Sequence, residues 1–294
     1  MPRIDIVEVV SPFPPLPLEL VRHILGFAAA ASRHASRNIC LVAPWARDIA
    51  LPYLFHTVVL NDKESYIKFR KYLHSPESYI PSNFDFKFSP TVLVRNLWVE
   101  GIRYDPRCIF PIYQSCDNLT HLALSVDLFN WLLNLSTPGL SEISDRASSR
   151  SPDLQVTFLS SMLGVIDTPS PIYKRVTHIC LTSASVVERH ISSFTRLSHI
   201  SMPCRGMSHR NQAHLRRFLG LKTLKMVVVV VLEDVVRTED REDLKGWVRG
   251  VRQTDSRVYM VERHSSRIRE DWENEMRGGD SMWDMAVRYT AELG

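Results

Sequence analysis

The stretches LSHISM at 197–202 and LKTLKM at 221–226 place apolar residues at the first, fourth and sixth of six positions. The same spacing recurs in three earlier segments, Val94-Leu97-Val99, Leu119-Leu122-Leu124 and Val176-Ile179-Leu181. Successive copies begin 25, 57, 21 and 24 residues apart, and the interval of 57 fits two repeats, one of them degenerate. A period of about 20–29 residues is typical of chains built from stacked supersecondary units. We therefore predict a repeat architecture.

The repeats predict a parallel sheet. In leucine-rich repeats, which have a period of this length, each copy adds one strand to a common sheet and the intervening segment covers one side. Segments 126–135 and 154–166 have apolar residues spaced for such covering helices, and Met226–Leu232 is typical of a strand buried on both faces. The predicted fold class is α/β, with an irregular leucine-rich-repeat-like solenoid over residues 93–235. We expect irregularity because the turn position that regular repeats fill with Asn or Cys holds Ile102, Asp127, Ala184, Arg205 and Val229.

Residues 236–294 are predicted to cap the solenoid. Residues 233–294 contain 15 acidic and 11 basic residues, a net charge of −4. The whole chain has 32 acidic and 36 basic residues, so residues 1–232 contain 17 acidic and 25 basic residues, a net charge of +8. Apolar spacing predicts a helix over 238–250, a last strand over 257–261, and a terminal helix over 281–293 with Trp283, Ala286, Val287 and Thr290 on one side. Terminal repeats need a polar outer face, which suits the charged composition of this region. A solvated charged surface without a capping role is the alternative interpretation.

The N-terminal part has a different pattern, that of three short helices. Prolines at positions 12, 14 and 15 exclude a helix there, so residues 1–15 are predicted to form an extended lead-in. Within residues 16–60, three clusters of apolar residues follow one another at helical spacing. A bundle of this size buries little surface and is only marginally stable without a partner. Residues 61–92, rich in Pro, Ser, Asn and Phe toward their end, are predicted to link this bundle to the repeats.

The N-terminal sequence resembles the F-box, as its most similar residues show: Leu16-Pro17-Leu18-Glu19-Leu20, then Ile24-Leu25, Leu41-Val42 and Trp45. The next residues, LPYLFHTV at 51–58, are similar to the end of that motif in a large group of fungal F-box-like proteins. The resemblance implies a three-helix bundle that docks on the Skp-type adaptor of a cullin-RING ubiquitin ligase. The adaptor-binding residues that it implies are Leu16, Pro17, Leu20, Ile24, Leu25, Leu41 and Trp45. Pro44 departs from the family pattern and fits it if the third helix begins there.

An F-box followed by repeats implies a substrate-recognition adaptor, which holds a target protein near the ubiquitin-charged enzyme so that catalysis depends on proximity. A second hypothesis remains open from the residues themselves: a repeat-based protein-interaction module whose N-terminal bundle binds no ligase. The first hypothesis predicts that Leu20, Ile24 and Trp45 lie on the surface. The alternative is that these side chains pack against one another inside the bundle.

Side chains alternate across a strand, so the residues between the apolar positions are expected on an open concave face. The candidate target-binding residues on that face are Trp98, His121, His178, Cys180 and His199, with Trp98 as the main anchor. If His178 and His199 lie on neighbouring strands, their Cβ atoms are about 4.8 Å apart. The imidazoles of His178 and His199 beside the Cys180 thiol leave two alternatives open. One is a zinc site, for which a fourth ligand is missing. The other is a thiol nucleophile, for which no orienting carboxylate is evident. We predict a partner-binding surface without metal.

Composition and charge exclude several classes of function. The net charge is only +4, from 36 Lys+Arg and 32 Asp+Glu, and no run of bases suggests a nucleic-acid partner. No apolar segment approaches the roughly 20 residues that cross a membrane, and the acids and prolines at the N-terminus do not fit a secretory signal. Five widely spaced cysteines without a C-x-x-C pair indicate reduced thiols and a cytoplasmic or nuclear protein. No phosphate-binding glycine loop, metal-binding histidine pair or serine elbow occurs, so neither enzyme activity nor a cofactor is predicted.

Overall fold

The chain folds into two compact units, Met1–Leu54 and Phe55–Gly294. The computed structural model describes residues 16–74, 90–100, 109–135, 153–159, 170–182 and 191–293. Three predicted segments therefore lie outside the described residues: the lead-in 1–15, positions 75–89 of the linker and positions 160–166 of one covering helix. The first unit ends a few residues before the boundary expected at position 60.

The first unit contains three short helices, α1 (Leu18–Ala31), α2 (Arg33–Ile39) and α3 (Pro44–His56), the last of which continues into the second unit. Ser32 begins α2 as its N-cap, because its hydroxyl accepts a hydrogen bond from the Ala35 amide at 3.0 Å. The Ser36 hydroxyl donates to the Ala29 carbonyl at 2.7 Å and so joins α2 to α1. The buried cluster of this unit is small and consists of Ala29, Ile39, Ala46 and Ala50. Three alanines remove little apolar surface from water, so this core is weak.

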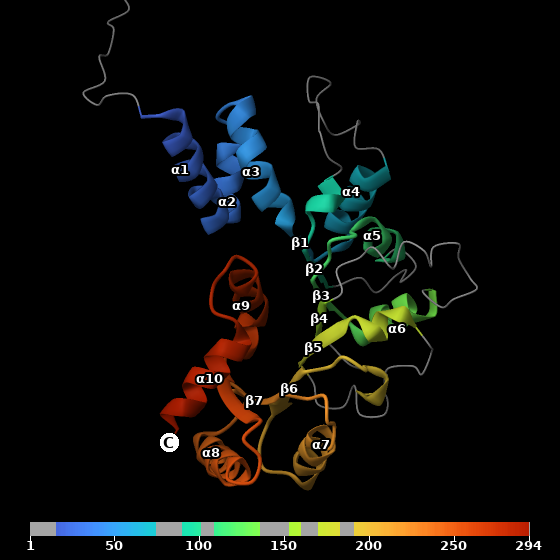
Figure 1. The fold of residues 1–294 in the computed structure, drawn as a ribbon, viewed down its shortest axis with the longest axis vertical. Coiled ribbons are helices and arrows are strands. Elements are labelled where there is room, and N and C mark those ends of the chain that lie inside the picture. Colours follow the sequence, from blue (N-terminus) through green and yellow to red (C-terminus); the bar gives the residue numbers. More distant parts are fainter. Residues whose placement is uncertain are drawn as a thin grey trace, which may run out of the picture. The chain divides into compact units, whose positions relative to one another are not determined.

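The second unit is built on one parallel sheet (Figure 1). Within the described residues, eight strands pair in the order of the sequence, and every pair is parallel. The strands are β1 Thr57–Leu60, β2 Asn96–Val99, β3 His121–Leu124, β4 Leu154–Phe158, β5 Val176–Leu181, β6 His199–Cys204, β7 Met226–Leu232 and β8 Val258–Arg263. Each described strand thus lies beside the one that precedes it in the chain. The predicted α/β fold with a parallel sheet is confirmed.

Strand β4 corrects the expectation of a covering helix over 154–166. Leu154, Val156 and Phe158 are buried, and the residues between them are partly exposed. This two-residue period belongs to a strand, whereas a helix buries every third or fourth residue. β4 pairs with β3 and β5 and so lies within the interval of 57 residues; a degenerate repeat there stays a prediction.

Strand β1 and helix α4 correct the boundaries expected around residue 60. β1 pairs with β2, so the last residues of the predicted bundle 16–60 belong to the sheet. The predicted linker 61–92 is wrong where α4 (Lys63–His74) forms. Asp62 begins this helix, because its Oδ1 accepts a hydrogen bond from the Ser65 amide at 2.7 Å. The linker composition lies mainly beyond this helix.

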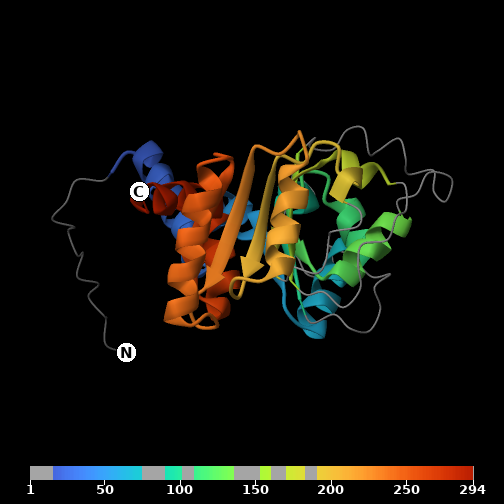
Figure 2. The ribbon, with the colours of Figure 1, turned by 90° about the horizontal axis from the view of Figure 1, so that it is seen from below.

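Helices cover one face of the sheet, termed the outer face. They are α4, α5 (Ile109–Ser115), α6 (Val126–Leu135), α7 (His209–Leu219) and α8 (Thr238–Arg252), with short 3-10 helices at Pro90–Leu93, Pro171–Lys174 and Ile191–Ser193. Their buried residues form one core with alternate strand residues such as Leu97, Leu122 and Val229. In Figure 2 the last strands run side by side next to α7 and α8. The helices predicted at 126–135 and 238–250 are confirmed, as is the burial of β7 along its whole length.

The opposite face, termed the inner face, is contacted by the last two helices, α9 (Ile268–Glu275) and α10 (Met282–Glu292), which follow a 3-10 turn at Ser265–Arg267. The Thr290 hydroxyl of α10 accepts from the Met260 amide at 2.8 Å and donates to the Met260 carbonyl at 3.2 Å. Thr290 therefore satisfies the open backbone of β8, the edge strand. The predicted last strand and terminal helix are confirmed, although Val287 is exposed. No helix in the described ranges is long and apolar enough to cross a membrane.

Candidate functional site

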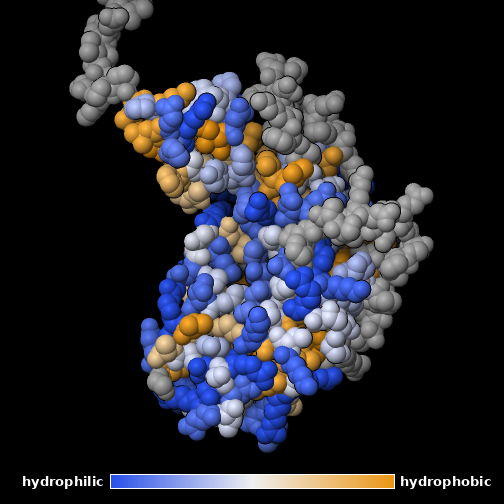
Figure 3. Space-filling view, in the orientation of Figure 1, coloured by the Kyte–Doolittle hydropathy of each residue, from blue (hydrophilic) through white to orange (hydrophobic). Residues whose placement is uncertain are grey.

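Most residues predicted to contact an adaptor lie on the surface of the first unit. The exposed fractions of the large ones are 56% for Leu16, 46% for Leu20, 49% for Ile24, 81% for Leu41 and 40% for Trp45. Pro17 is also exposed, whereas Leu25 is partly buried against the alanine-rich cluster. In Figure 3, hydrophobic side chains are visible on the surface of α1–α3. The predicted exposure is confirmed, and contact with an adaptor stays a prediction.

Four further exposed apolar residues of the first unit were not predicted to bind the adaptor: Leu18, Phe27, Val42 and Tyr53. Phe27 is 75% exposed on α1, and Val42, in the turn after α2, is 69% exposed. Leu20, Ile24 and Phe27 follow i, i+4, i+7 spacing, so they share one side of α1. This spacing is the signal that identifies Phe27, which continues the stripe begun by Leu20. An apolar helix side open to solvent is uncommon outside interaction sites.

The turn that precedes α3 is fixed by a polar contact. Arg47 donates from Nε to the Cys40 carbonyl at 2.9 Å, which ties the end of α2 to α3. Pro44 begins α3, at a position where a helix offers no acceptor for the amide that proline lacks. The condition under which Pro44 fits the F-box pattern is therefore met. Trp45 follows at the next position of the helix.

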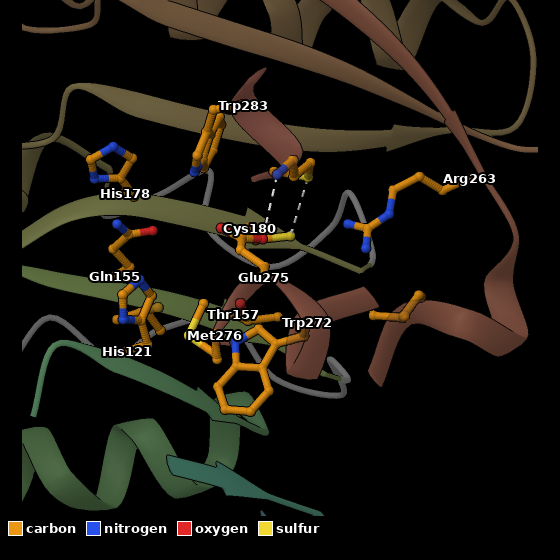
Figure 4. A pocket seen from close by; sticks show the side chains of 13 residues that line it. His121, Gln155, Thr157, His178, Cys180, Arg263, Trp272, Glu275, Met276 and Trp283 are labelled. Atoms are coloured by element: carbon orange, nitrogen blue, oxygen red, sulfur yellow. Dashed lines mark hydrogen bonds between the residues drawn. The ribbon is translucent and has the colours of Figure 1, made fainter. Parts of the chain in front are cut away.

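On the inner face, a row of polar side chains crosses neighbouring strands. The sheet register aligns His121 with Gln155, Gln155 with His178, and His178 with His199. The imidazole rings of His178 and His199 stack, with centroids 4.2 Å apart and planes inclined by 13°. Figure 4 shows His121, Gln155 and His178 one after another along this row. The prediction that His178 and His199 lie on neighbouring strands is confirmed.

A hydroxyl residue precedes each of these histidines and fixes its ring. The hydroxyls of Thr120, Thr177 and Ser198 lie 3.0, 2.9 and 2.8 Å from the Nδ1 atoms of His121, His178 and His199. The Thr120 hydroxyl also donates to the Arg95 carbonyl at 3.2 Å, and the Ser198 hydroxyl to the Thr177 carbonyl at 3.1 Å. A hydroxyl has one proton, so Nδ1–H of His121 and of His199 donates to the hydroxyl oxygen. Their Nε2 atoms remain as acceptors.

Burial keeps these imidazoles neutral. It lowers the pKa of His121 to about 4 and the pKa of His178 to about 3, and neighbouring histidines add to both effects. The pKa of His199 is also lowered, first by burial and then by the charge of Lys225. At neutral pH the row therefore presents uncharged hydrogen-bonding groups.

The chain itself covers this face, which corrects the expectation of an open concave surface. Trp98, the predicted anchor, is only 2% exposed, and its ring centroid lies 5.2 Å from that of Trp272 in α9. Trp283 of α10 lies 5.3 Å from the ring centroids of both His178 and His199. The reason is that apolar inner-face residues gain free energy by packing against the apolar sides of α9 and α10. Trp98 is therefore not available to a target in this conformation.

A cavity of about 30 Å³ remains between the sheet and these two helices (Figure 4). Its lining includes His121, Gln155, Thr157, His178 and Cys180 from the strands, and Trp272, Glu275 and Trp283 from the helices. This volume holds one or two water molecules and excludes an organic ligand. Trp272 and Glu275 were not predicted here, because the charged segment that contains them indicated a solvated surface.

Cys180 lies in this cavity as a protonated thiol. Its Sγ donates to Sδ of Met282 at 3.9 Å, and burial raises the pKa of the thiol. Burial also raises the pKa of Glu275, which accepts from the Met282 amide at 3.4 Å. A protonated thiol is a weak nucleophile. In the described part of the chain, no group of three or more His, Cys, Asp and Glu residues is placed to hold a metal ion. The geometry gives the zinc and nucleophile alternatives no support.

The structure thus offers two sets of candidate residues: the exposed apolar residues of the first unit and the polar row of the inner face. No protein-family model matches this sequence, and a search of curated proteins finds no match. Function is therefore argued from these residues.

Proposed function

We propose that this chain is the substrate-recognition adaptor of an SCF-type cullin-RING ubiquitin ligase, in which an F-box-like first unit binds the Skp-type adaptor. The observation that supports this proposal best is the exposure of Leu20, Ile24 and Trp45 on a unit whose own core is mostly alanine. These are residues on which the resemblance to the F-box rests. A few apolar and aromatic anchors commonly dominate the affinity of an interface.

The apolar side of α1 gives the first unit an energetic reason to bind a partner. Leu20, Ile24 and Phe27 leave much of their surface in water, which is unfavourable for the isolated unit. Burying one such side chain in an interface contributes about 1.5–3 kcal/mol. A second polypeptide that covers this side would therefore stabilise the unit as well as bind it.

For the second unit we propose an irregular leucine-rich-repeat solenoid that holds the target protein. The support is the sequential parallel order of the strands and their repeated apolar spacing. Ubiquitin transfer would be performed by the enzyme bound elsewhere in the ligase, so the chain itself needs no catalytic residue or cofactor. Such an assembly acts in the cytoplasm or the nucleus.

Binding to purified Skp-type adaptor tests the proposal. The full chain and two variants are compared in a pull-down: Leu20→Asp with Ile24→Asp, and a matched control, Val235→Asp with Val287→Asp. The control residues are 45% and 46% exposed but belong to the second unit. We expect wild type and control to retain the adaptor and the first variant to lose it, because a charge cannot be buried in an apolar interface.

Two results would contradict the proposal: no adaptor bound to the wild-type chain, or equal binding by the wild type and the Leu20→Asp, Ile24→Asp variant. Either result favours the alternative function, a repeat-based protein-interaction module without ligase association.

A further inference from the structure

We propose that the solvent side of α7, together with the loops at its two ends, is a docking surface for an acidic segment of a partner protein. In the receptor proposed above, this partner is the target. The inference therefore gives the chemical class of the target, and only that assignment rests on the proposed function.

The surface belongs to an acid-free part of the sequence. From Ile191 to Leu232 the chain has seven bases and no Asp or Glu: Arg196, Arg205, Arg210, Arg216, Arg217, Lys222 and Lys225. Arg196 pairs with Asp153 at 2.8 Å, a carboxylate from an earlier repeat. Among the described residues, the other six have no carboxylate within salt-bridge distance. Their positive charge is therefore not neutralised by ion pairs within the described structure.

Helix geometry gathers three of these charges on one side of α7. The helix buries His214, Leu215 and Phe218. Arg210, Arg216 and Arg217 are exposed; Arg210 lies at the border of the buried side, where its Nε donates to Nε2 of His214 at 3.3 Å, and Arg217 is two turns after it. A helix of 11 residues is about 16 Å long, which matches roughly five residues of an extended peptide.

The remaining charges extend the surface beyond both ends of the helix. Arg205 is exposed in the loop between β6 and α7, and Lys222 and Lys225 are exposed between α7 and β7. The loop after α7 is tied to the segment that precedes β6, since the Lys225 amide donates to the Ser198 carbonyl at 2.8 Å, and the loop before α7 is tied to the helix by Asn211, whose Nδ2 donates to the Gly206 carbonyl at 2.9 Å. The charges therefore sit on a fixed scaffold.

Helix stability explains only part of these charges: Arg216 and Arg217 lie in the last turn of α7, where a cation favours the helix dipole, whereas Arg210 lies in the first turn. The first turn of α7 contains His209 and Arg210 and no acid, whereas α8, α9 and α10 each begin with acidic residues. A cation near a helix N-terminus opposes the helix dipole. On the neighbouring α8, Lys245 is paired with Glu242 at 2.8 Å and with Glu262 at 3.3 Å. Helix stability therefore leaves Arg205, Arg210, Lys222 and Lys225 unexplained, and these bases indicate a partner.

The side chains favour a carboxylate-bearing protein over nucleic acid or a lipid surface. Arginine binds carboxylates and phosphates alike through two parallel hydrogen bonds, so the other side chains of the surface decide between these partners. Single-stranded nucleic acid is held largely by stacking on exposed aromatic rings, and the phenylalanines of this region, Phe194 and Phe218, are buried. Membrane-surface helices need a broad apolar side, but here Met207 is the only exposed large hydrophobic residue described between Ile191 and Leu232.

Fluorescence anisotropy with the full chain tests this surface. The probe is a fluorescein-labelled peptide of consecutive glutamates, compared with a labelled oligo-dT of equal charge and with vesicles of phosphatidylserine and phosphatidylcholine. Arg210→Glu with Arg217→Glu removes charge from α7, and Lys222→Glu with Lys225→Glu removes it from the following loop. Arg267→Glu with Arg288→Glu is the matched control, since it changes net charge equally at two exposed arginines elsewhere.

We expect the wild-type chain to bind the glutamate peptide, with affinity that falls steeply as salt is added. Each α7-side variant should weaken binding by about tenfold or more, and the control by less than about twofold. The loop variant tests the surface even if the helix variant fails to fold. Absence of wild-type binding, or equal weakening by the control, would overturn the proposal. Tighter binding to oligo-dT or to the vesicles would overturn it as well, because the partner class would be wrong. The adaptor is not part of this assay, so its outcome is independent of the F-box proposal.

Discussion

The two units of the chain use large apolar residues in opposite ways. In the second unit, Phe129 and Phe158 are fully buried between the sheet and its outer helices. In the first unit, Ile24 and Phe27 are exposed, and the buried cluster is mostly alanine. A sheet has two broad faces that helices of the same chain can cover, whereas three short helices cannot enclose all of their own apolar residues. The comparison shows how apolar residues can be left available for a partner.

The largest effect on stability is expected from Phe129→Ala. The Phe129 ring contacts Phe158 edge-on at 5.1 Å and stacks near Phe194 at 6.4 Å, in the centre of the outer-face core. Truncation leaves a cavity and should lower the free energy of unfolding by about 3–5 kcal/mol. Urea denaturation followed by circular dichroism measures this change. A loss below about 1 kcal/mol would mean that the outer-face core is not packed as described.

Acid should weaken the second unit through its inner-face histidines. The pKa is about 4 for His121 and about 3 for His178 in the folded state. It is near 6.5 for both in the unfolded chain. Between these values the unfolded chain binds more protons, so stability is present near neutral pH and decreases as the pH falls. We expect the free energy of unfolding to decrease between pH 7 and pH 5 by about 2 kcal/mol for each of the two histidines.

Thermal unfolding across this pH range measures the effect. His121→Gln with His178→Gln should flatten the dependence of melting temperature on pH, whereas His34→Gln, at an exposed residue of the first unit, should not. An unchanged dependence in the double variant would show that other groups cause the acid sensitivity.

A smaller loss is expected at the edge of the sheet. Thr290→Val keeps the shape of the side chain but removes both hydrogen bonds to the Met260 backbone. Leaving these buried groups without a partner should cost about 1–3 kcal/mol. The measurement is again urea denaturation, with Thr223→Val as the control at an exposed strand-proximal threonine. If both variants lose the same stability, Thr290 does not cap the edge strand.

Much of the sheet could be predicted because its strands repeat one spacing. The exception is β4, in which the register places Asp153 where Leu119 stands in the preceding repeat. Asp153 is an acid that pairs with Arg196, and it stands at the first apolar position of the spacing. The spacing therefore does not identify β4. β1 was missed because its residues also continue the F-box-like segment.

The covering of the inner face could not be predicted in the same way. In α9 and its C-cap, Ile268, Trp272 and Met276 are spaced four residues apart among charged residues, but no periodicity connects them with Trp98. Local spacing identifies which residues share a face of one element. It does not show which distant segment packs on that face, because such contacts depend on the path of the whole chain.

Phe27→Ala makes in the first unit the same substitution that Phe129→Ala makes in the second unit. Because Phe27 is 75% exposed, its truncation should change the free energy of unfolding by less than about 0.5 kcal/mol. The same variant should weaken adaptor binding by about 1 kcal/mol or more if Phe27 extends the docking stripe of α1. Urea denaturation and titration with purified Skp-type adaptor measure the two quantities. A stability loss close to that of Phe129→Ala would mean that Phe27 is buried within the chain, and the first unit would then have a core of its own instead of a surface for a partner.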